Sequence, residues 1–125
     1  MITSMPKILV AEDDALLSAL LVRSLVAEGF ETHAAYDGLE TLLEIKSWHP
    51  DLVLLDLLMP NKDGLSVLAD VRADSELSKT HVIVFSNLGD TDTIELVKKF
   101  GVSEYFIKAN TTPHEIVAKV KSIFA

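Results

Sequence analysis

A short apolar run that ends in a single acid constrains the fold of this chain more than any other stretch. Residues Asp51–Leu55 are mostly apolar without alternation, which is typical of a β-strand buried on both faces. Asp56 follows directly, and a protein interior does not tolerate its carboxylate unless the group opens onto water or a cation. Met59-Pro60 ends the strand, and Asp63-Gly64 supplies turn chemistry. Asp56 therefore either caps a turn or lies where an open α/β sheet places its working residues.

Strand-like and helix-like segments alternate along the whole chain. Apolar segments of strand length occupy residues 6–11, 30–36, 51–55, 81–86 and 104–108. Helical periodicity or a helix-start signal follows each of them. The sequence therefore predicts one α/β domain over residues 1–125, a doubly wound parallel sheet of five strands with five helices. The segment 30–36 is the most polar, so we expect it at an edge of the sheet.

Specific predictions concern three of the five helices. The fourth helix is expected to open at Asp92 with Glu95, and Thr112–Glu115 combines a capping box with Pro at the first helical position. Gly29 is expected to stop the first helix. That helix should bury one face, formed by Leu17, Leu20, Leu21 and Leu25.

Charge and composition exclude several classes of function. The chain has 11 basic and 19 acidic residues, a net charge of −8, which disfavours direct nucleic-acid binding. It has no cysteine, so disulfides and thiolate metal sites are excluded. No apolar stretch approaches membrane-spanning length, and residues 1–6 lack the form of a signal peptide. We therefore expect a cytoplasmic protein that contacts neither membrane nor nucleic acid directly.

Polar groups of different kinds end four of the five predicted strands. In a parallel sheet these ends share one edge, so the groups can meet in one crevice. Acids gathered there repel one another, and a hard divalent ion such as Mg²⁺, or Mn²⁺ in its place, relieves the repulsion. Asp56 can then stay ionised and act as a nucleophile. The groups, in strand order, are Glu12-Asp13-Asp14, Asp56, Ser86 and Lys108.

These groups suit phosphoryl transfer, in which a protein mainly positions groups and neutralises charge. The ion would cover one phosphoryl oxygen, the Lys108 ammonium a second, and the Ser86 hydroxyl with nearby backbone N–H groups a third. Each residue also has a structural explanation of its own. The acids could cap a helix, as we expect of Asp14, while Ser86 could begin a turn and Lys108 could be an exposed lysine. Their occurrence together on four strand ends favours the functional explanation.

The sequence resembles the receiver domain of bacterial two-component response regulators over residues 7–124. This resemblance implies a flavodoxin-like sheet with strand order 2-1-3-4-5. It also implies a phospho-accepting module without an output domain in residues 1–125, whose only chemistry is self-phosphorylation and slow self-hydrolysis. The motifs that carry it are Ile8–Asp14, Asp51–Pro60 with Asp63-Gly64, Ser86, and Tyr105–Lys108.

The resemblance also assigns roles at the site. Asp56 would accept a phosphoryl group from a phosphohistidine on a histidine kinase or histidine phosphotransfer protein. Asp13 would bind Mg²⁺ directly, Glu12 would act through water, and the backbone carbonyl of Leu58 would complete the protein ligands. Lys108 would hold a phosphoryl oxygen.

Ser86 and Tyr105 are the switch residues that the resemblance implies. Ser86 would hold a phosphoryl oxygen and move toward it, while Tyr105 rotates inward. The face built from the fourth helix, fifth strand and fifth helix would then change its preference for a downstream protein or effector domain, or for a second copy in a phosphorylation-dependent homodimer. Physically, phosphorylation shifts the population between two existing states.

Several positions depart from the family pattern. The hydroxyl residue is Ser86 where Thr is commoner. Ala109 replaces the usual Pro after the lysine, which leaves the customary cis peptide open. Asn87 replaces a small residue, and it either crowds the site or adds a hydrogen bond. Leu58 and Leu88 stand where fast-hydrolysing relatives carry polar groups that orient water, which predicts a long-lived phosphorylated state.

Two other function classes fit the predicted fold less well. A phosphohydrolase resembling the haloacid dehalogenase family would want a second acid at the position of Leu58, and the chain has no room for the usual cap insertion. A flavodoxin-like nucleotide binder would want a glycine-rich loop after the first strand, and none follows it. The sequence is compatible both with a free-standing receiver and with one domain of a longer regulator or hybrid kinase.

Overall fold

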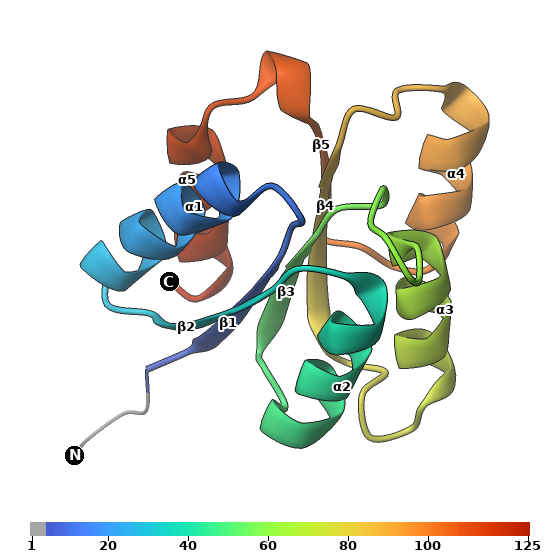
Figure 1. Cartoon of the computed structure of the whole chain (residues 1–125), viewed down its shortest axis with the longest axis horizontal. Coiled ribbons are helices and arrows are strands. Elements are labelled where there is room, and N and C mark those ends of the chain that lie inside the picture. Colours follow the sequence, from blue (N-terminus) through green and yellow to red (C-terminus); the bar gives the residue numbers. More distant parts are fainter. Residues whose placement is uncertain (1–4) are drawn as a thin grey trace.

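A central sheet between two layers of helices forms the computed structural model, which describes residues 5–125 (Figure 1). Residues 1–4, part of the segment that we expect not to be a signal peptide, lie outside the described residues. None of the helices in the described part is long and apolar enough to cross a membrane. The elements are β1 (Lys7–Ala11), α1 (Ala15–Ala27), β2 (Glu31–Ala35), α2 (Gly38–Trp48), β3 (Leu52–Leu55), α3 (Gly64–Ala73), β4 (His81–Ser86), α4 (Thr91–Lys99), β5 (Glu104–Ile107), the short 3₁₀ turn η1 (Lys108–Asn110) and α5 (Pro113–Ile123).

The five strands form one parallel sheet in the order β2-β1-β3-β4-β5, which confirms the predicted fold class and strand order. Each strand lies within a residue or two of its predicted position. The polar strand β2 lies at an edge, as its composition indicates, and exposes Glu31 and His33. β3 lies in the centre with all four residues buried, so its apolar run without alternation is explained by burial on both faces.

The strands contribute side chains to two separate core clusters, one on each face of the sheet. Helices α1 and α5 cover one face, and α2, α3 and α4 cover the other (Figure 1). Alternate residues of each strand point to opposite faces, so Val53 packs toward α2–α4 while its neighbours Leu52 and Leu54 pack toward α1 and α5. Because both clusters pack against the same sheet, side chains hold the backbone of the strands from both faces.

A side-chain cap begins each of the five α-helices, and one of them differs from the prediction. Thr112 and Glu115 form the predicted capping box of α5. At α4 the cap is Asp90, whose carboxylate accepts from the Thr93 N–H at 3.0 Å and from the Thr93 hydroxyl at 2.7 Å. The prediction that the helix opens at Asp92 is wrong. An N-cap side chain bonds the amide two or three residues later, and Asp90 has this spacing to Thr93, while Asp92 lies in the first turn.

Helix α1 buries a narrower stripe than its leucines predict. Leu21 and Leu25 are fully buried, but Leu20 is 47% exposed, so its expected place on the inner face is wrong. The third member of the stripe is Ser18, which is also fully buried. Positions 18, 21 and 25 follow the three-and-four spacing of one helix face, whereas position 20 is rotated about 100° away from position 21. Hydrophobicity alone therefore misplaces Leu20.

Candidate functional site

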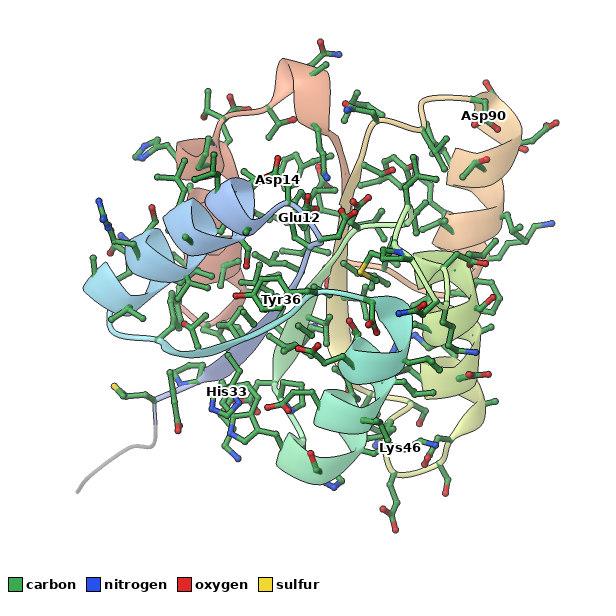
Figure 2. The ribbon with its side chains drawn as sticks, in the orientation of Figure 1. Glu12, Asp14, His33, Tyr36, Lys46 and Asp90 are labelled. Carbon is green, nitrogen blue, oxygen red and sulfur yellow. The ribbon has the colours of Figure 1, made fainter. Side chains whose placement is uncertain are left out.

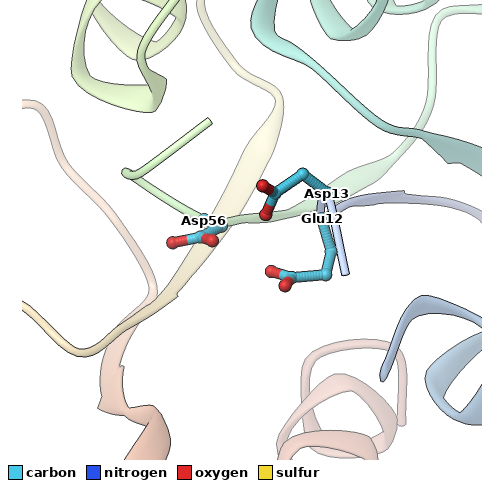
Figure 3. Close-up of side chains that lie close together, drawn as sticks. All are labelled: Glu12, Asp13 and Asp56. Carbon is cyan, nitrogen blue, oxygen red and sulfur yellow. The ribbon is translucent and has the colours of Figure 1, made fainter. Parts of the chain in front are cut away.

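Three carboxyl groups lie together at the carboxyl ends of β1 and β3. One oxygen each of Glu12, Asp13 and Asp56 lies within 4.8 Å of the others (Figure 3). Glu12 is 1% exposed and Asp56 3%, whereas Asp13 is open to solvent. Backbone hydrogen bonds extend the sheet one step past each strand, from Glu12 N–H to Ala35 O and from Asp56 N–H to Ala11 O. The buried acids therefore project from fixed backbone.

Lys108 reaches the same cluster from the end of β5. Its Nζ lies 2.6 Å from Glu12 Oε2 and 2.9 Å from Asp56 Oδ2. The ammonium also stands 5.0 Å from the centroid of the Phe85 ring, in the range of a cation–π contact. The predicted convergence of the first, third and fifth strand ends is therefore present, although the pairing of Lys108 with Glu12 was not foreseen.

Burial and neighbouring charge shift the ionisation of this cluster. Burial, with a smaller contribution from Asp56, raises the pKa of Glu12 to about 7 against the opposing effect of Lys108. Burial alone would lower the pKa of Lys108, but its hydrogen bonds to Glu12 and Asp56 outweigh this and raise the pKa. Lys108 therefore stays charged, and its ammonium contacts two of the three carboxyl groups in the cluster. Such a set of closely spaced oxygen donors fits a hard divalent cation.

The start of α3 packs closely against the loop that carries Asp56. The Leu58 N–H donates to Asp56 Oδ1 at 3.1 Å, and the Gly64 N–H donates to Leu57 O at 2.9 Å. A Cβ on Gly64 would lie 2.2 Å from the backbone oxygen of Asp56, which no side chain tolerates. The Asp63-Gly64 pair indicates a turn in the sequence, but the need for glycine comes from this contact between α3 and the loop that carries Asp56.

Ser86 and Tyr105 are joined through the loop that follows β4. Ser86 is fully buried at the end of β4, and its hydroxyl oxygen accepts from the Leu88 N–H at 3.3 Å. The Tyr105 hydroxyl donates to Leu88 O. Burial raises the pKa of Tyr105, which keeps it a donor. In the described part of the chain no hydrogen bond joins Ser86 to Asp56 or Lys108, so its hydroxyl is engaged by its own loop.

Asp14 and Asn87 each accept a hydrogen bond from a backbone N–H group outside the carboxylate cluster. Asp14 does not join the carboxylate cluster, because its side chain caps α1 (Figure 2). Asn87 adds a hydrogen bond, since its Oδ1 accepts from the Ala109 N–H at 3.0 Å. No peptide bond within residues 5–125 is cis, including the bond between Lys108 and Ala109.

Comparisons with known proteins agree with this geometry. The family profile of the response regulator receiver domain matches residues 8–121. The DNA-binding response regulator MtrA of Mycobacterium tuberculosis is 36% identical over 120 residues, which cover 96% of this chain and 51% of MtrA. The phosphate regulon regulatory protein PhoB of Rhizobium meliloti is 32% identical over 119 residues, covering 95% of this chain and 52% of PhoB. The chain thus spans about half the length of these curated relatives.

Solved structures show the same relationship. The receiver domain of Francisella response regulator 1452 is 30% identical, with a TM-score of 0.85 and coverage of 95% of this chain and 96% of that one. A CheY-like receiver domain protein from Methanospirillum hungatei has a TM-score of 0.88 at 22% identity, covering 96% and 94% of the two chains, and supports the fold alone. These comparisons give no support to the phosphohydrolase alternative. The chain belongs to the response regulator receiver domains of two-component systems.

Proposed function

We propose that residues 1–125 form a single receiver domain that accepts a phosphoryl group on Asp56 from a phosphohistidine of a histidine kinase or histidine phosphotransfer protein. One observation carries the proposal. Asp56 is almost fully buried, yet its carboxylate lies among Glu12, Asp13 and the ammonium of Lys108. A buried carboxylate that neighbouring charges hold in place is suited to nucleophilic attack on phosphorus.

The transfer exchanges one bond for another. A bond forms between a carboxylate oxygen of Asp56 and phosphorus, and the bond between phosphorus and the donor imidazole nitrogen breaks. The imidazole keeps the electron pair and takes up a proton. The Leu58 N–H holds Oδ1 of Asp56, while Lys108 contacts Oδ2, so the carboxylate is oriented before the donor arrives. Lys108 and Ser86 are the residues that would then hold the phosphoryl oxygens.

A Mg²⁺ ion fits the carboxylate cluster, and Mn²⁺ could substitute for it. Asp13 and Asp56 would bind it directly, Glu12 would act through water, and the backbone carbonyl of Leu58 would complete the protein ligands. The fit rests on three oxygen donors within 4.8 Å and on the excess of negative charge around Lys108. When bound, the ion supplies positive charge that lets the acids stay ionised and offsets charge on a phosphoryl oxygen.

The signal would leave the site through the contacts after β4. Ser86 bonds Leu88, and Leu88 in turn accepts from Tyr105 on β5. Movement of Ser86 toward a phosphoryl oxygen would break the first bond and shift the second, which alters the face of α4, β5 and α5. The partner at that face would be an effector domain, a separate downstream protein or a second copy. Because the relatives include DNA-binding response regulators, a DNA-binding effector is the first to test.

Phosphorylation by acetyl phosphate in the presence of Mg²⁺ tests the proposal. Intact mass should show one added phosphoryl group on the wild-type protein and none on Asp56→Ala. Asp92→Ala, an exposed acid in the first turn of α4, should behave like the wild type. Removal of Mg²⁺ with a chelator should stop the gain. Phosphorylation of both the wild type and Asp56→Ala, or of neither, would contradict the assignment.

A further inference from the structure

Two residues that depart from the family pattern, Asn87 and Ala109, bond to each other. Asn87 Oδ1 accepts from the backbone N–H of Ala109 at 3.0 Å. A proline at position 109 has no N–H to donate, and a small apolar residue at position 87 has no oxygen to accept. The bond therefore requires both departures together. We propose that Asn87 is a positioning residue that fixes the backbone at the base of Lys108, and this inference rests on the proposed function.

The bond continues the sheet past its last backbone pair. β4 and β5 run parallel, and their final paired residues are Ser86 and Ile107. Asn87 directly follows Ser86, and Ala109 lies two residues beyond Ile107. The side-chain oxygen of Asn87 accepts the Ala109 N–H at a position where backbone pairing between the two strands has ended. Lys108 is thereby flanked by a strand-paired residue on one side and a tethered residue on the other.

The placement of Lys108 explains why such a tether matters. A lysine carries its charge at the end of a flexible four-carbon stem, so the position of the ammonium depends on the backbone that bears it. Here the ammonium must meet Glu12 and Asp56 together, at 2.6 and 2.9 Å. The 3₁₀ turn Lys108–Asn110 is short, and its Ala109 N–H donates to the side chain of Asn87, the residue that directly follows β4. Loss of that bond would let the base of the lysine move.

The tether also joins the two backbone segments that carry phosphoryl-holding groups. Ser86 immediately precedes Asn87, and Lys108 immediately precedes Ala109. The bond between Asn87 and Ala109 therefore limits how far the Ser86 backbone and the Lys108 backbone can move relative to each other. We expect this bond to raise the rate of phosphoryl transfer, because it holds Ser86 and Lys108 in place before the donor binds. Asn87 would do so without touching the phosphoryl group.

A double-mutant cycle on phosphorylation by acetyl phosphate tests the proposal. The four proteins are the wild type, Asn87→Ala, Ala109→Pro and the double variant. Asn87→Ala should lower the rate at saturating acetyl phosphate by about fivefold, the worth of one hydrogen bond, and leave the half-saturating concentration unchanged. In the Ala109→Pro background, where the donor is gone, Asn87→Ala should have no further effect.

Two kinetic outcomes would overturn the proposal. If Asn87→Ala changes the rate by the same factor in both backgrounds, or raises it, then Asn87 acts by crowding the site and not through Ala109. If Asn87→Ala leaves the wild-type rate unchanged, the residue positions nothing that the transfer needs.

Amide exchange provides a test that needs no phosphorylation and no proline variant. The Ala109 amide should exchange with solvent about fivefold faster in Asn87→Ala than in the wild type, as the loss of one hydrogen bond predicts. Equal exchange rates would overturn the inference even if Asp56 is phosphorylated. Faster exchange in a protein that acetyl phosphate fails to modify would instead count against the proposed function and leave the contact established.

Discussion

At the scale of single residues, burial of acids around one lysine governs the site. Glu12 and Asp56 are nearly inaccessible to water, and both contact Lys108. Removal of one partner from such a group leaves a buried charge without compensation, which costs far more than an exposed ion pair is worth. The arrangement therefore indicates function more than stability, because a well-packed apolar cluster would stabilise the strand ends at lower cost.

The ionisation of Glu12 leads to a prediction about stability and pH. Its pKa rises from 4.5 to about 7 on folding, so between these values the folded state binds more protons than the unfolded state. The free energy of unfolding should therefore fall as pH rises through this window, by on the order of 3 kcal/mol. Urea unfolding in chelator between about pH 4 and pH 8 should show this fall in the wild type and lose it in Glu12→Gln.

Glu95→Gln, at an exposed position of α4, serves as the matched control and should retain the wild-type pH profile. The same fall in Glu12→Gln as in the wild type would show that Glu12 titrates normally in the folded protein.

At the scale of elements, the first residues of α2 and α3 both contact the loop between β3 and α3. A Cβ on Gly38 would lie 1.7 Å from Lys62 O, and a Cβ on Gly64 would lie 2.2 Å from Asp56 O. Both glycines also donate to this loop, from Gly38 N–H to Pro60 O and from Gly64 N–H to Leu57 O. Helices α2 and α3 thus shape the loop that carries Asp56 through backbone contacts, and glycine is required at both positions because of space and not because of positive φ.

Substitution of Gly64 tests this contact. Gly64→Ala should lower the free energy of unfolding by about 1–3 kcal/mol, since the added methyl group meets backbone that must move. It should also slow phosphorylation of Asp56, because the displaced loop carries both the acceptor and Leu58. Gly89→Ala is the control, as its Cβ would meet only the end of Ile107 at 3.6 Å. Equal urea stability of the two variants would show that the loop yields without cost.

At the scale of the whole molecule, the sheet connects the carboxylate cluster with the face of α4, β5 and α5. The site lies at the carboxyl ends of the strands, and Tyr105 on β5 reaches the loop after β4 through Leu88. Figure 1 shows β5 and α4 on the side of the sheet away from β2. A change at the site can therefore reach the face of α4, β5 and α5 through one strand and one loop, and the two residues on this route, Leu88 and Tyr105, pack against the core cluster under α2, α3 and α4.

We expect the lifetime of phosphorylated Asp56 to depend on tertiary structure too, because Leu58 and Leu88 come from two separate loops. Two apolar side chains near the site should exclude the attacking water and prolong the phosphorylated state. Leu58→Asn combined with Leu88→Glu should speed dephosphorylation by about tenfold or more, since polar groups there can orient water. The decay of the intact phosphorylated mass after removal of acetyl phosphate measures the rate.

Leu39→Asn combined with Leu43→Glu, at exposed leucines of α2, makes the same chemical changes away from the site and should leave the decay unchanged. An unchanged decay rate in the Leu58 and Leu88 variant as well would refute the water-exclusion explanation.

Sequence reasoning predicted the elements well because their signals are local. Buried strands show uninterrupted apolar runs, and helix caps act over three or four residues, so Thr112 was readable as a helix start. Asp63, which was predicted only as part of a turn, is the N-cap of α3. The start of α4 was misplaced although its signal, the Asp90 cap, is also local. The error at Leu20 has another cause, because there the tertiary environment decides. Leu20 is as hydrophobic as Leu21, and only the seating of α1 on the sheet shows which of them faces inward.

The sequence by itself determined the fold class, the strand order through family resemblance, and the set of polar residues at the strand ends. Only the tertiary structure decided which of those residues touch. Lys108 and Glu12 are 96 positions apart and Asn87 and Ala109 are 22 apart, yet each pair is in hydrogen-bond contact. The physical reason is that strand register and side-chain length together set these distances, and neither the approach of Gly64 to Asp56 nor the burial of Glu12 has a local signature in the chain.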